Sequence, residues 1–118
     1  MAKKILIIDD SATAVSLIKG VLEKEGHEVI TAKKGEEGIR SAGEKNPDLV
    51  FVDTLLPDID GFEVCKRIKE ARNAPKVILM TGSIDAIDAV RARKSGADEY
   101  AVKTSNFSKL LEAAKGLI

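Results

Sequence analysis

Residues 4–10 read Lys-Ile-Leu-Ile-Ile-Asp-Asp, a short apolar run that ends in two adjacent carboxylates. The run is apolar on both faces, which is typical of a buried strand in a parallel sheet. Asp9 and Asp10 therefore lie where the expected sheet meets water. Two carboxylates this close repel each other unless a cation binds between them. The stretch predicts both a parallel sheet and a divalent metal site at its edge.

The rest of the chain alternates between short apolar runs and amphipathic stretches. The further runs are Glu28–Ala32, Leu49–Val52, Lys76–Met80 and Tyr100–Val102. Apolar residues in the stretches between them have helical spacing, for example at Val15, Ile18 and Leu22. Strands that alternate with helices through short loops indicate an α/β fold, in which five helices cover both faces of a five-stranded parallel sheet. We expect the crossovers to be right-handed.

Composition narrows the class of protein. The chain has 118 residues, of which 44% are hydrophobic and 32% charged, and this fits one domain over residues 1–118. Its 19 basic and 19 acidic residues give a net charge of zero, which argues against binding of nucleic acid or an anionic membrane. No apolar run is long enough to span a membrane, no signal-peptide pattern follows Met1, and the lone Cys65 cannot form an internal disulfide. We therefore expect a cytoplasmic protein.

Reactive side chains come at the ends of the other expected strands. Asp53 ends the third run, Thr81 follows the fourth and Lys103 follows the fifth. Ligands of open α/β sheets bind outside the carboxyl ends of the strands, so these groups should lie near Asp9 and Asp10. Three carboxylates favour a hard cation such as Mg²⁺, and an ammonium with a hydroxyl can neutralise phosphoryl oxygens. Asp53 stands alone on the central strand and is the best candidate for a nucleophile that forms an aspartyl-phosphate.

Through these motifs the chain resembles response-regulator receiver domains, the CheY-like signalling modules. The resemblance covers the full length and includes Asp9-Asp10, Asp53, Pro57-Asp58-Ile59-Asp60-Gly61, Thr81 and Gly96-Ala97-Asp98-Glu99-Tyr100-Ala101-Val102-Lys103. It implies a flavodoxin-like, doubly wound sheet with strand order 2-1-3-4-5. It also implies a phospho-accepting switch of a two-component system, which is not an enzyme because it catalyses only its own phosphorylation and dephosphorylation.

The resemblance implies a phosphoryl acceptor and a metal site. Asp53 is expected to take a phosphoryl group from a histidine kinase or a phosphotransfer protein in a Mg²⁺-dependent reaction. Asp10, Asp53 and the backbone carbonyl of Leu55 are expected to bind Mg²⁺ directly, and Asp9 through water. Lys103 is expected to pair with the phosphoryl group.

The resemblance also implies a conformational switch. Thr81 is expected to hydrogen-bond the phosphoryl group and to shift with it, after which Tyr100 turns inward. The face formed by the fourth helix, the fifth strand and the fifth helix would then change its affinity for a downstream protein target. Such a change is a population shift between two states, biased by the charge added at the site.

Some positions depart from the family pattern or modulate it. Thr104 follows Lys103, where the family usually has a proline joined through a cis peptide. A cis peptide before a non-proline residue costs about 2.5–4 kcal/mol, so we expect either a trans peptide with a rearranged loop or a strained cis peptide. Leu55 and Ser83 occupy positions that tune the lifetime of the phosphoryl group in the family, and an apolar Leu55 is expected to slow the attack of water.

Three other functions fit part of the pattern. A pseudo-receiver would bind a partner without phosphorylation, and Thr104 is the feature that favours it. A phosphatase with an Asp nucleophile needs a general acid two residues after that nucleophile, where this chain has Leu55. A flavin-binding protein would share the strand order, but the first loop lacks the expected phosphate cradle and only 3% of the residues are aromatic.

Several residues with reactive or polar side chains have a structural interpretation. Cys65 lies on the apolar face of its helix and is expected in the core. His27 comes just before the second strand without an evident ligand partner, and it is expected in a turn. Asp58 and Asp60 are expected to form the turn after the third strand and to supply a helix cap.

Overall fold

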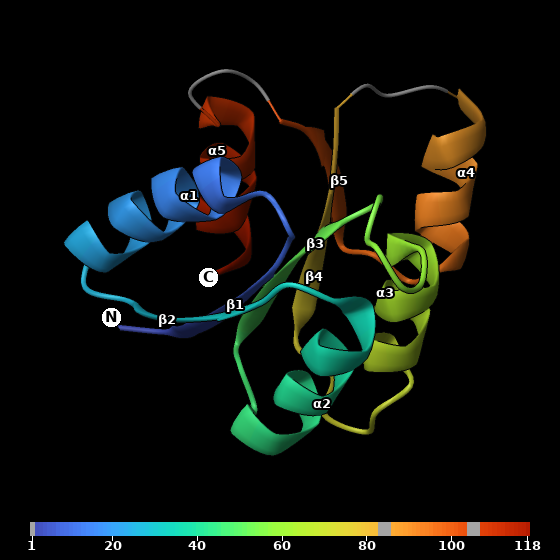
Figure 1. The fold of residues 1–118 in the computed structure, drawn as a ribbon, viewed down its shortest axis with the longest axis horizontal. Helices are drawn as coiled ribbons and strands as arrows, with labels where there is room; N and C mark the ends of the chain where they lie inside the picture. The colour runs from blue at the N-terminus through green and yellow to red at the C-terminus, as the bar shows by residue number, and fades with distance from the viewer. Residues whose placement is uncertain (1, 83–85, 104–106) are drawn as a thin grey trace.

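The computed structural model describes residues 2–82, 86–103 and 107–118, in which strands and helices alternate (Figure 1). The strands are β1 (Lys4–Ile8), β2 (Glu28–Ala32), β3 (Leu49–Asp53), β4 (Lys76–Thr81) and β5 (Glu99–Val102). The helices are α1 (Ala12–Lys24), α2 (Gly35–Lys45), α3 (Gly61–Lys69), α4 (Ala86–Lys94) and α5 (Ser108–Leu117). Neighbouring strands are parallel, and their order is β2-β1-β3-β4-β5. The expected fold class and strand order are therefore confirmed.

Two layers of helices cover the sheet because its central strands are apolar on both faces. Figure 1 shows α1 and α5 on one side of the sheet and α2, α3 and α4 on the other. Along β1, Ile5 and Ile7 pack in the cluster that contains α1 and α5, whereas Leu6 and Ile8 pack in the cluster that contains the other helices. All four side chains are fully buried. The same alternation along β3 and β4 makes the sheet the shared wall of two apolar cores.

The register of the strands brings their polar ends to one edge of the sheet. Ile8 pairs with Val52, so Asp9 and Asp53 leave the sheet side by side. Lys103 directly follows β5, which is parallel to its neighbour β4, and it leaves the sheet at the same edge.

Three of the structural interpretations are confirmed. Cys65 is fully buried in α3. Nδ1 of His27 accepts the backbone N–H of Lys3 at 3.1 Å, just before β2 begins. Asp60 is the N-cap of α3, and its carboxylate accepts the N–H of Glu63 at 2.9 Å. These residues thus have structural partners at the positions where the sequence predicts structural roles.

Two expectations fall outside the part of the chain that the structure describes. Ser83 and Thr104 both lie there, and so does the peptide that joins Thr104 to Lys103. Within the described ranges, no helix is long and apolar enough to cross a membrane.

Candidate functional site

Three carboxylates meet at the carboxyl end of the sheet. Asp9 and Asp10 follow β1 and Asp53 ends β3, and each places an oxygen within 4.8 Å of the other two. Asp9 and Asp53 are buried, with 1% and 8% of their surfaces exposed, whereas Asp10 is exposed. A set of three carboxylate oxygens fits a hard divalent cation and not a soft metal.

Lys103 reaches the same cluster from the end of β5. Its Nζ lies 2.7 Å from Oδ2 of Asp9 and 3.2 Å from Oδ2 of Asp53. Only 18% of the Lys103 side chain is exposed, so both ion pairs are largely shielded from solvent. Three ionised carboxylates and one ammonium still leave two negative charges uncompensated. The cluster therefore has the charge as well as the donor atoms to bind one divalent cation.

The close approach of these charged groups shifts the pKa of Asp53 and of Lys103. Burial raises the pKa of Asp53 to about 6, repulsion from Asp9 adds to the rise, and attraction to Lys103 opposes it. Burial acts to lower the pKa of Lys103, but its hydrogen bond to Asp9 and the charge of Asp53 outweigh burial and raise this pKa above its usual value. Lys103 is thus a permanent cation at physiological pH. Asp53 is ionised at neutral pH and takes up a proton near pH 6.

Backbone N–H groups orient the two buried carboxylates. Ser11 donates to Oδ1 of Asp9 at 2.9 Å, and Leu55 donates to Oδ1 of Asp53 at 3.3 Å. Both oxygens of Asp9 therefore have partners, because Lys103 approaches the other one. Leu55 is 80% exposed, so it lies at the surface next to the cluster and outside the core.

The two expected switch residues have different surroundings. Thr81 is the buried last residue of β4, and its carbonyl accepts the backbone N–H of Lys103 at 2.7 Å. Tyr100 is half-buried on β5, and its ring centroid lies 6.3 Å from that of Phe62 in α3. Thr81 therefore adjoins the cluster, whereas Tyr100 faces the helices that cover the sheet on the α3 side.

Asp58 makes a contact that the sequence does not reveal. Its carboxylate accepts the backbone N–H groups of Gly35 and Glu36, the first residues of α2, at 2.7 and 3.0 Å. Asp58 thus caps a helix 22 residues earlier in the chain, and not only the turn in which it lies. The one sequence signal for this contact is Lys34, whose side chain stands at the N-cap of α2 and has no oxygen to accept a hydrogen bond.

Arg91 in α4 makes a second contact of this kind. Its guanidinium carbon lies 4.2 Å from the ring centroid of Phe62, and Nη2 lies 3.2 Å from Oδ2 of Asp60. A guanidinium over an aromatic face is a favourable cation–π arrangement. Asp88 of α4 itself lies 3.7 Å from Nη1 of Arg91. Phe62 and Asp60, in contrast, belong to α3 and its N-cap, so spacing within α4 does not reveal the contacts with them.

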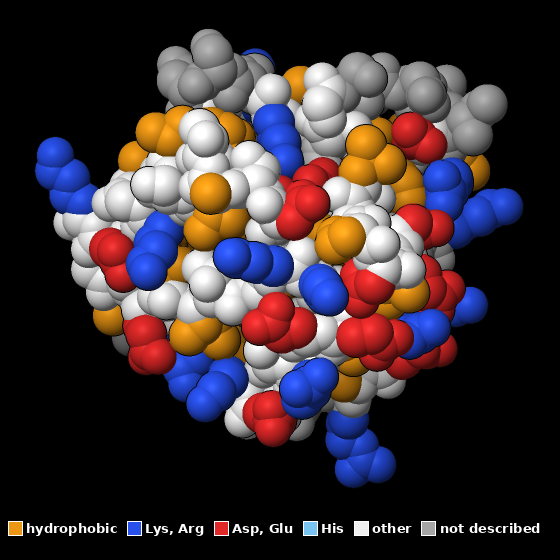
Figure 2. Space-filling view, in the orientation of Figure 1, with side chains coloured by type: hydrophobic (Ala, Val, Ile, Leu, Met, Phe, Trp, Pro, Cys, Tyr) orange, Lys and Arg blue, Asp and Glu red, His pale blue; other side chains and the backbone are white. Residues whose placement is uncertain are grey.

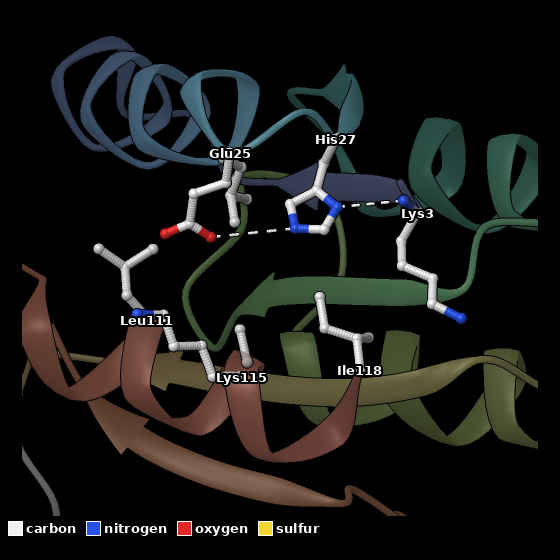
Figure 3. Close-up of a pocket in the computed structure, with 8 residues that line it drawn as sticks. Lys3, Glu25, His27, Leu111, Lys115 and Ile118 are labelled. Atoms are coloured by element: carbon white, nitrogen blue, oxygen red, sulfur yellow. Dashed lines mark hydrogen bonds and ion pairs between the residues drawn. The ribbon is translucent and has the colours of Figure 1, made fainter. Parts of the chain in front are cut away.

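Two hollows in the described surface have different surroundings. One of about 310 Å³ adjoins Asp9 and Asp10. Another of about 430 Å³ lies at the opposite edge of the sheet, where Nε2 of His27 is 3.9 Å from Oε2 of Glu25 (Figure 3). The lining of this second hollow includes none of the expected site residues. The chemistry expected from the sequence therefore gathers at the carboxyl edge of the strands.

Comparison with known proteins decides the family. The model of the response regulator receiver domain family matches residues 5–115. The chain is a response regulator receiver domain. It is 39% identical to the alkaline phosphatase synthesis transcriptional regulatory protein PhoP of Bacillus subtilis and 46% identical to the transcriptional regulatory protein AfsQ1 of Streptomyces coelicolor. Each alignment covers 87% of this receiver domain, but only 43% of PhoP and 45% of AfsQ1, so the chain spans less than half the length of either relative.

Solved structures share the fold over nearly the whole chain. The CheY-like receiver domain protein from Methanospirillum hungatei aligns with a TM-score of 0.90 and 34% identity over 98% of this chain and 93% of that one. TrrA from Thermotoga maritima, solved in complex with Mg²⁺-BeF, aligns with a TM-score of 0.88 and 37% identity over 98% of this chain and 99% of that one. The receiver domain is therefore a phospho-accepting signalling switch of the two-component type.

Proposed function

We propose that this receiver domain accepts a phosphoryl group on Asp53 from the phosphohistidine of a histidine kinase or a phosphotransfer protein. The observation that carries the proposal is the Asp53 carboxylate itself, held among two further carboxylates and the Lys103 ammonium at 3.2 Å. In the reaction an Asp53 oxygen forms a bond to phosphorus, and the N–P bond of the phosphohistidine breaks with its electron pair going to the imidazole. The carboxylate is ionised for this attack at neutral pH, because its pKa is about 6.

We propose that the carboxylate cluster binds Mg²⁺. Asp10, Asp53 and the backbone carbonyl of Leu55 would be direct ligands, and Asp9 would act through water. The closer contact of the Lys103 ammonium with Asp9, at 2.7 Å against 3.2 Å for Asp53, supports this division. When bound, Mg²⁺ would neutralise charge on the transferred phosphoryl group.

Lys103 and Thr81 would bind the phosphoryl group from the other side. The Lys103 ammonium already lies beside an oxygen of Asp53, so a short movement would pair it with a phosphoryl oxygen. The Thr81 hydroxyl would donate a hydrogen bond to another oxygen. Thr81 ends β4, the strand next to the one that carries Asp53, and this proximity supports its role.

We propose that Thr81 and Tyr100 transmit phosphorylation to the face formed by α4, β5 and α5, and that a downstream protein binds there. A hollow of about 740 Å³ along this face is lined by residues of β5 and α5, including Tyr100, Lys109 and Leu117. Figure 2 shows acidic and basic side chains interspersed over the face of the molecule seen in Figure 1. The chain as a whole has a net charge of zero, which favours protein partners over nucleic acid or membrane.

We further infer that residues 1–118 form one receiver domain that works in the cytoplasm. It would catalyse only its own phosphorylation and dephosphorylation, and it would not turn over other substrates.

The test is phosphorylation by acetyl phosphate and by a panel of purified histidine kinases, with and without Mg²⁺. We expect one phosphoryl group per chain, seen as a mass increase, only when Mg²⁺ is present. Asp53→Ala should abolish the modification. Asp48→Ala is the matched control, because the Asp48 carboxylate accepts the Lys4 N–H at 2.8 Å at the opposite edge of the sheet. A phosphorylated Asp53→Ala variant, or a wild type that no donor modifies, would contradict the proposal.

A further inference from the structure

The loop from Thr54 to Asp60 connects Asp53 to α3 and is fixed at both of its ends. The backbone N–H of Thr54 donates to the carbonyl of Met80 at 2.9 Å, and that of Gly61 donates to the carbonyl of Thr54 at 3.0 Å. Gly61 lies so close to β3 that a Cβ there would overlap the carbonyl oxygen of Asp53. The ends of the loop therefore cannot shift without moving β3 or α3. These contacts do not hold the middle of the loop.

Asp58 anchors the middle of the loop by binding the start of α2. Oδ1 accepts the N–H of Gly35 at 2.7 Å, and Oδ2 accepts the N–H of Glu36 at 3.0 Å. These N–H groups belong to the first turn of a helix, where no intrahelical acceptor exists. They also hold the pKa of Asp58 below its usual value, so the anchor is a carboxylate at any physiological pH.

The neighbouring residue Ile59 packs against the same helix start. A Cβ added to Gly35 would lie 2.5 Å from Cγ1 of Ile59 and 2.8 Å from Cγ2 of Val64. The loop therefore approaches the backbone of α2 at a position that leaves no room for a side chain. Polar and apolar contacts together fix residues 58 and 59 on α2.

The start of α2 is in turn fixed to the strand that carries Asp9 and Asp10. Gly38, one turn into the helix, lies against Ile8, and a Cβ there would overlap the end of the Ile8 side chain. Ile8 is the last residue of β1 and directly precedes the two carboxylates. The first turn of α2 thus contacts both the β1 end of the carboxylate cluster and the loop that contains Leu55.

We propose that Asp58 is a positioning residue for the Mg²⁺ site, holding the Leu55 backbone in register with Asp9 and Asp10 by tying the loop to the start of α2. The inference rests on the function proposed above, in which the Leu55 carbonyl is a ligand. Few other contacts hold Leu55, because the residue is 80% exposed and its N–H reaches Oδ1 of Asp53 only at 3.3 Å.

The first measurement is Mg²⁺ binding by isothermal titration calorimetry. Residues that orient metal ligands typically change metal affinity by 10-fold or more when removed, so we expect Asp58→Ala to bind Mg²⁺ roughly 10-fold more weakly than wild type. The rate of phosphorylation by acetyl phosphate should fall at limiting Mg²⁺ and return close to the wild-type rate at saturating Mg²⁺. The rate should recover at saturating Mg²⁺ because the Asp58 carboxylate contacts the start of α2 and not Asp53. Asp48→Ala, which also removes a carboxylate that accepts a backbone N–H, should bind Mg²⁺ like wild type.

A second variant separates loop positioning from helix capping. Lys34 has the extended backbone, with φ −127° and ψ 156°, that an N-cap residue adopts. A serine there can cap α2 locally without touching the loop. We therefore expect Lys34→Ser in the Asp58→Ala background to recover the melting temperature lost in the single variant, while Mg²⁺ affinity stays weak.

Three results would overturn the inference. Wild-type affinity in Asp58→Ala would show that the tie to α2 does not position the site. Recovery of affinity together with stability in the double variant would show that Asp58 acts only as a helix cap. Failure of the wild type to bind Mg²⁺ at all would overturn the proposed function as well, so the two failures are distinguishable.

Discussion

In the folded receiver domain the Asp53 carboxyl has a pKa near 6, because burial and Asp9 disfavour its charge more than Lys103 favours it. In the unfolded chain the same carboxyl has its ordinary pKa of 3.8. The folded chain therefore binds this proton more tightly, and its stability falls as the pH rises from about 4 to about 6. Above pH 6 the cost of the buried charge is complete and no longer changes with pH.

The variant Asp53→Asn tests this cost because asparagine resembles the protonated acid. At pH 7 without divalent metal, we expect its free energy of unfolding to exceed that of wild type by on the order of 1 kcal/mol, allowing for partial access of solvent to the site. Near pH 4 the two proteins should be equally stable, because Asp53 is then neutral in the folded wild type. Urea denaturation followed by circular dichroism at both pH values measures the difference. A destabilised Asp53→Asn at pH 7 would contradict the raised pKa.

Whereas the buried charge of Asp53 destabilises the fold, the Lys103 ammonium stabilises the folded state by pairing with Asp9 and Asp53. The side chain of Asp9 is fully buried. We expect Lys103→Ala to lower the free energy of unfolding by about 1–3 kcal/mol at pH 7, since two partly compensated charges lose their partner. Mg²⁺ affinity, measured by calorimetry, should rise because no ammonium competes for the carboxylates. Phosphorylation by acetyl phosphate should slow at the same time. Weaker Mg²⁺ binding in this variant would contradict the geometry.

The meeting of the three carboxylates and Lys103 at one edge was predictable from the sequence, because strand ends identify these residues without knowledge of tertiary contacts. Asp9, Asp53 and Lys103 each directly follow or end an apolar run, and parallel strands share one carboxyl edge. Asp58 and Asp60 were predicted to form a turn and to supply a helix cap, but the sequence does not show that Asp58 caps α2. Its partners in α2 lie 22 and 23 residues away, and no periodicity in the chain encodes that approach.

At the scale of single elements, the strands were predicted almost to the residue. The expected run Leu49–Val52 is β3 with Asp53 added, and Lys76–Met80 is β4 with Thr81 added. Buried parallel strands are unambiguous because every position must be apolar until the strand meets water. The start of α2 was harder to predict, because its cap comes from another segment and its own N-cap residue, Lys34, makes no capping hydrogen bond.

Two glycines within helices have different surroundings, so we expect alanine to have opposite effects on stability at the two positions. Gly20 in α1 is exposed, with nothing within 4 Å of an added Cβ, whereas Gly38 in α2 is buried against Ile8. We expect Gly20→Ala to stabilise the fold by about 0.5–1 kcal/mol, because alanine favours the helix. Gly38→Ala should destabilise it by about 1–3 kcal/mol, because Ile8 must leave its packed rotamer. Thermal melts of both variants test the pair, and a stabilised Gly38→Ala would contradict the packing of α2 on β1.

At the scale of the whole molecule, the site exists only when the sheet is complete. Its side chains come from residues 9 to 103, and only the pairing of β1, β3, β4 and β5 brings them within bonding distance. The unfolded chain therefore has no comparable site. Any ligand of the cluster must stabilise the fold by mass action.

Mg²⁺ and protons should compete for the Asp53 carboxylate, so the stabilisation by Mg²⁺ should depend on pH. At pH 7, Mg²⁺ at 100 times its dissociation constant should add about 2.7 kcal/mol to the free energy of unfolding, or a rise in melting temperature of roughly 10 °C. Below pH 6 a proton occupies Asp53, so Mg²⁺ affinity should fall about tenfold between pH 7 and pH 5. At the same Mg²⁺ concentration the stabilisation at pH 5 should then be about 1.4 kcal/mol, roughly half of its value at pH 7. Differential scanning calorimetry at both pH values, with Ca²⁺-free Mg²⁺, measures the effect. Asp53→Asn, which cannot take up that proton, should show a small rise that is the same at both pH values. An equally large rise at pH 5 and pH 7 in wild type would mean that Mg²⁺ stabilises the fold at a site that does not include Asp53.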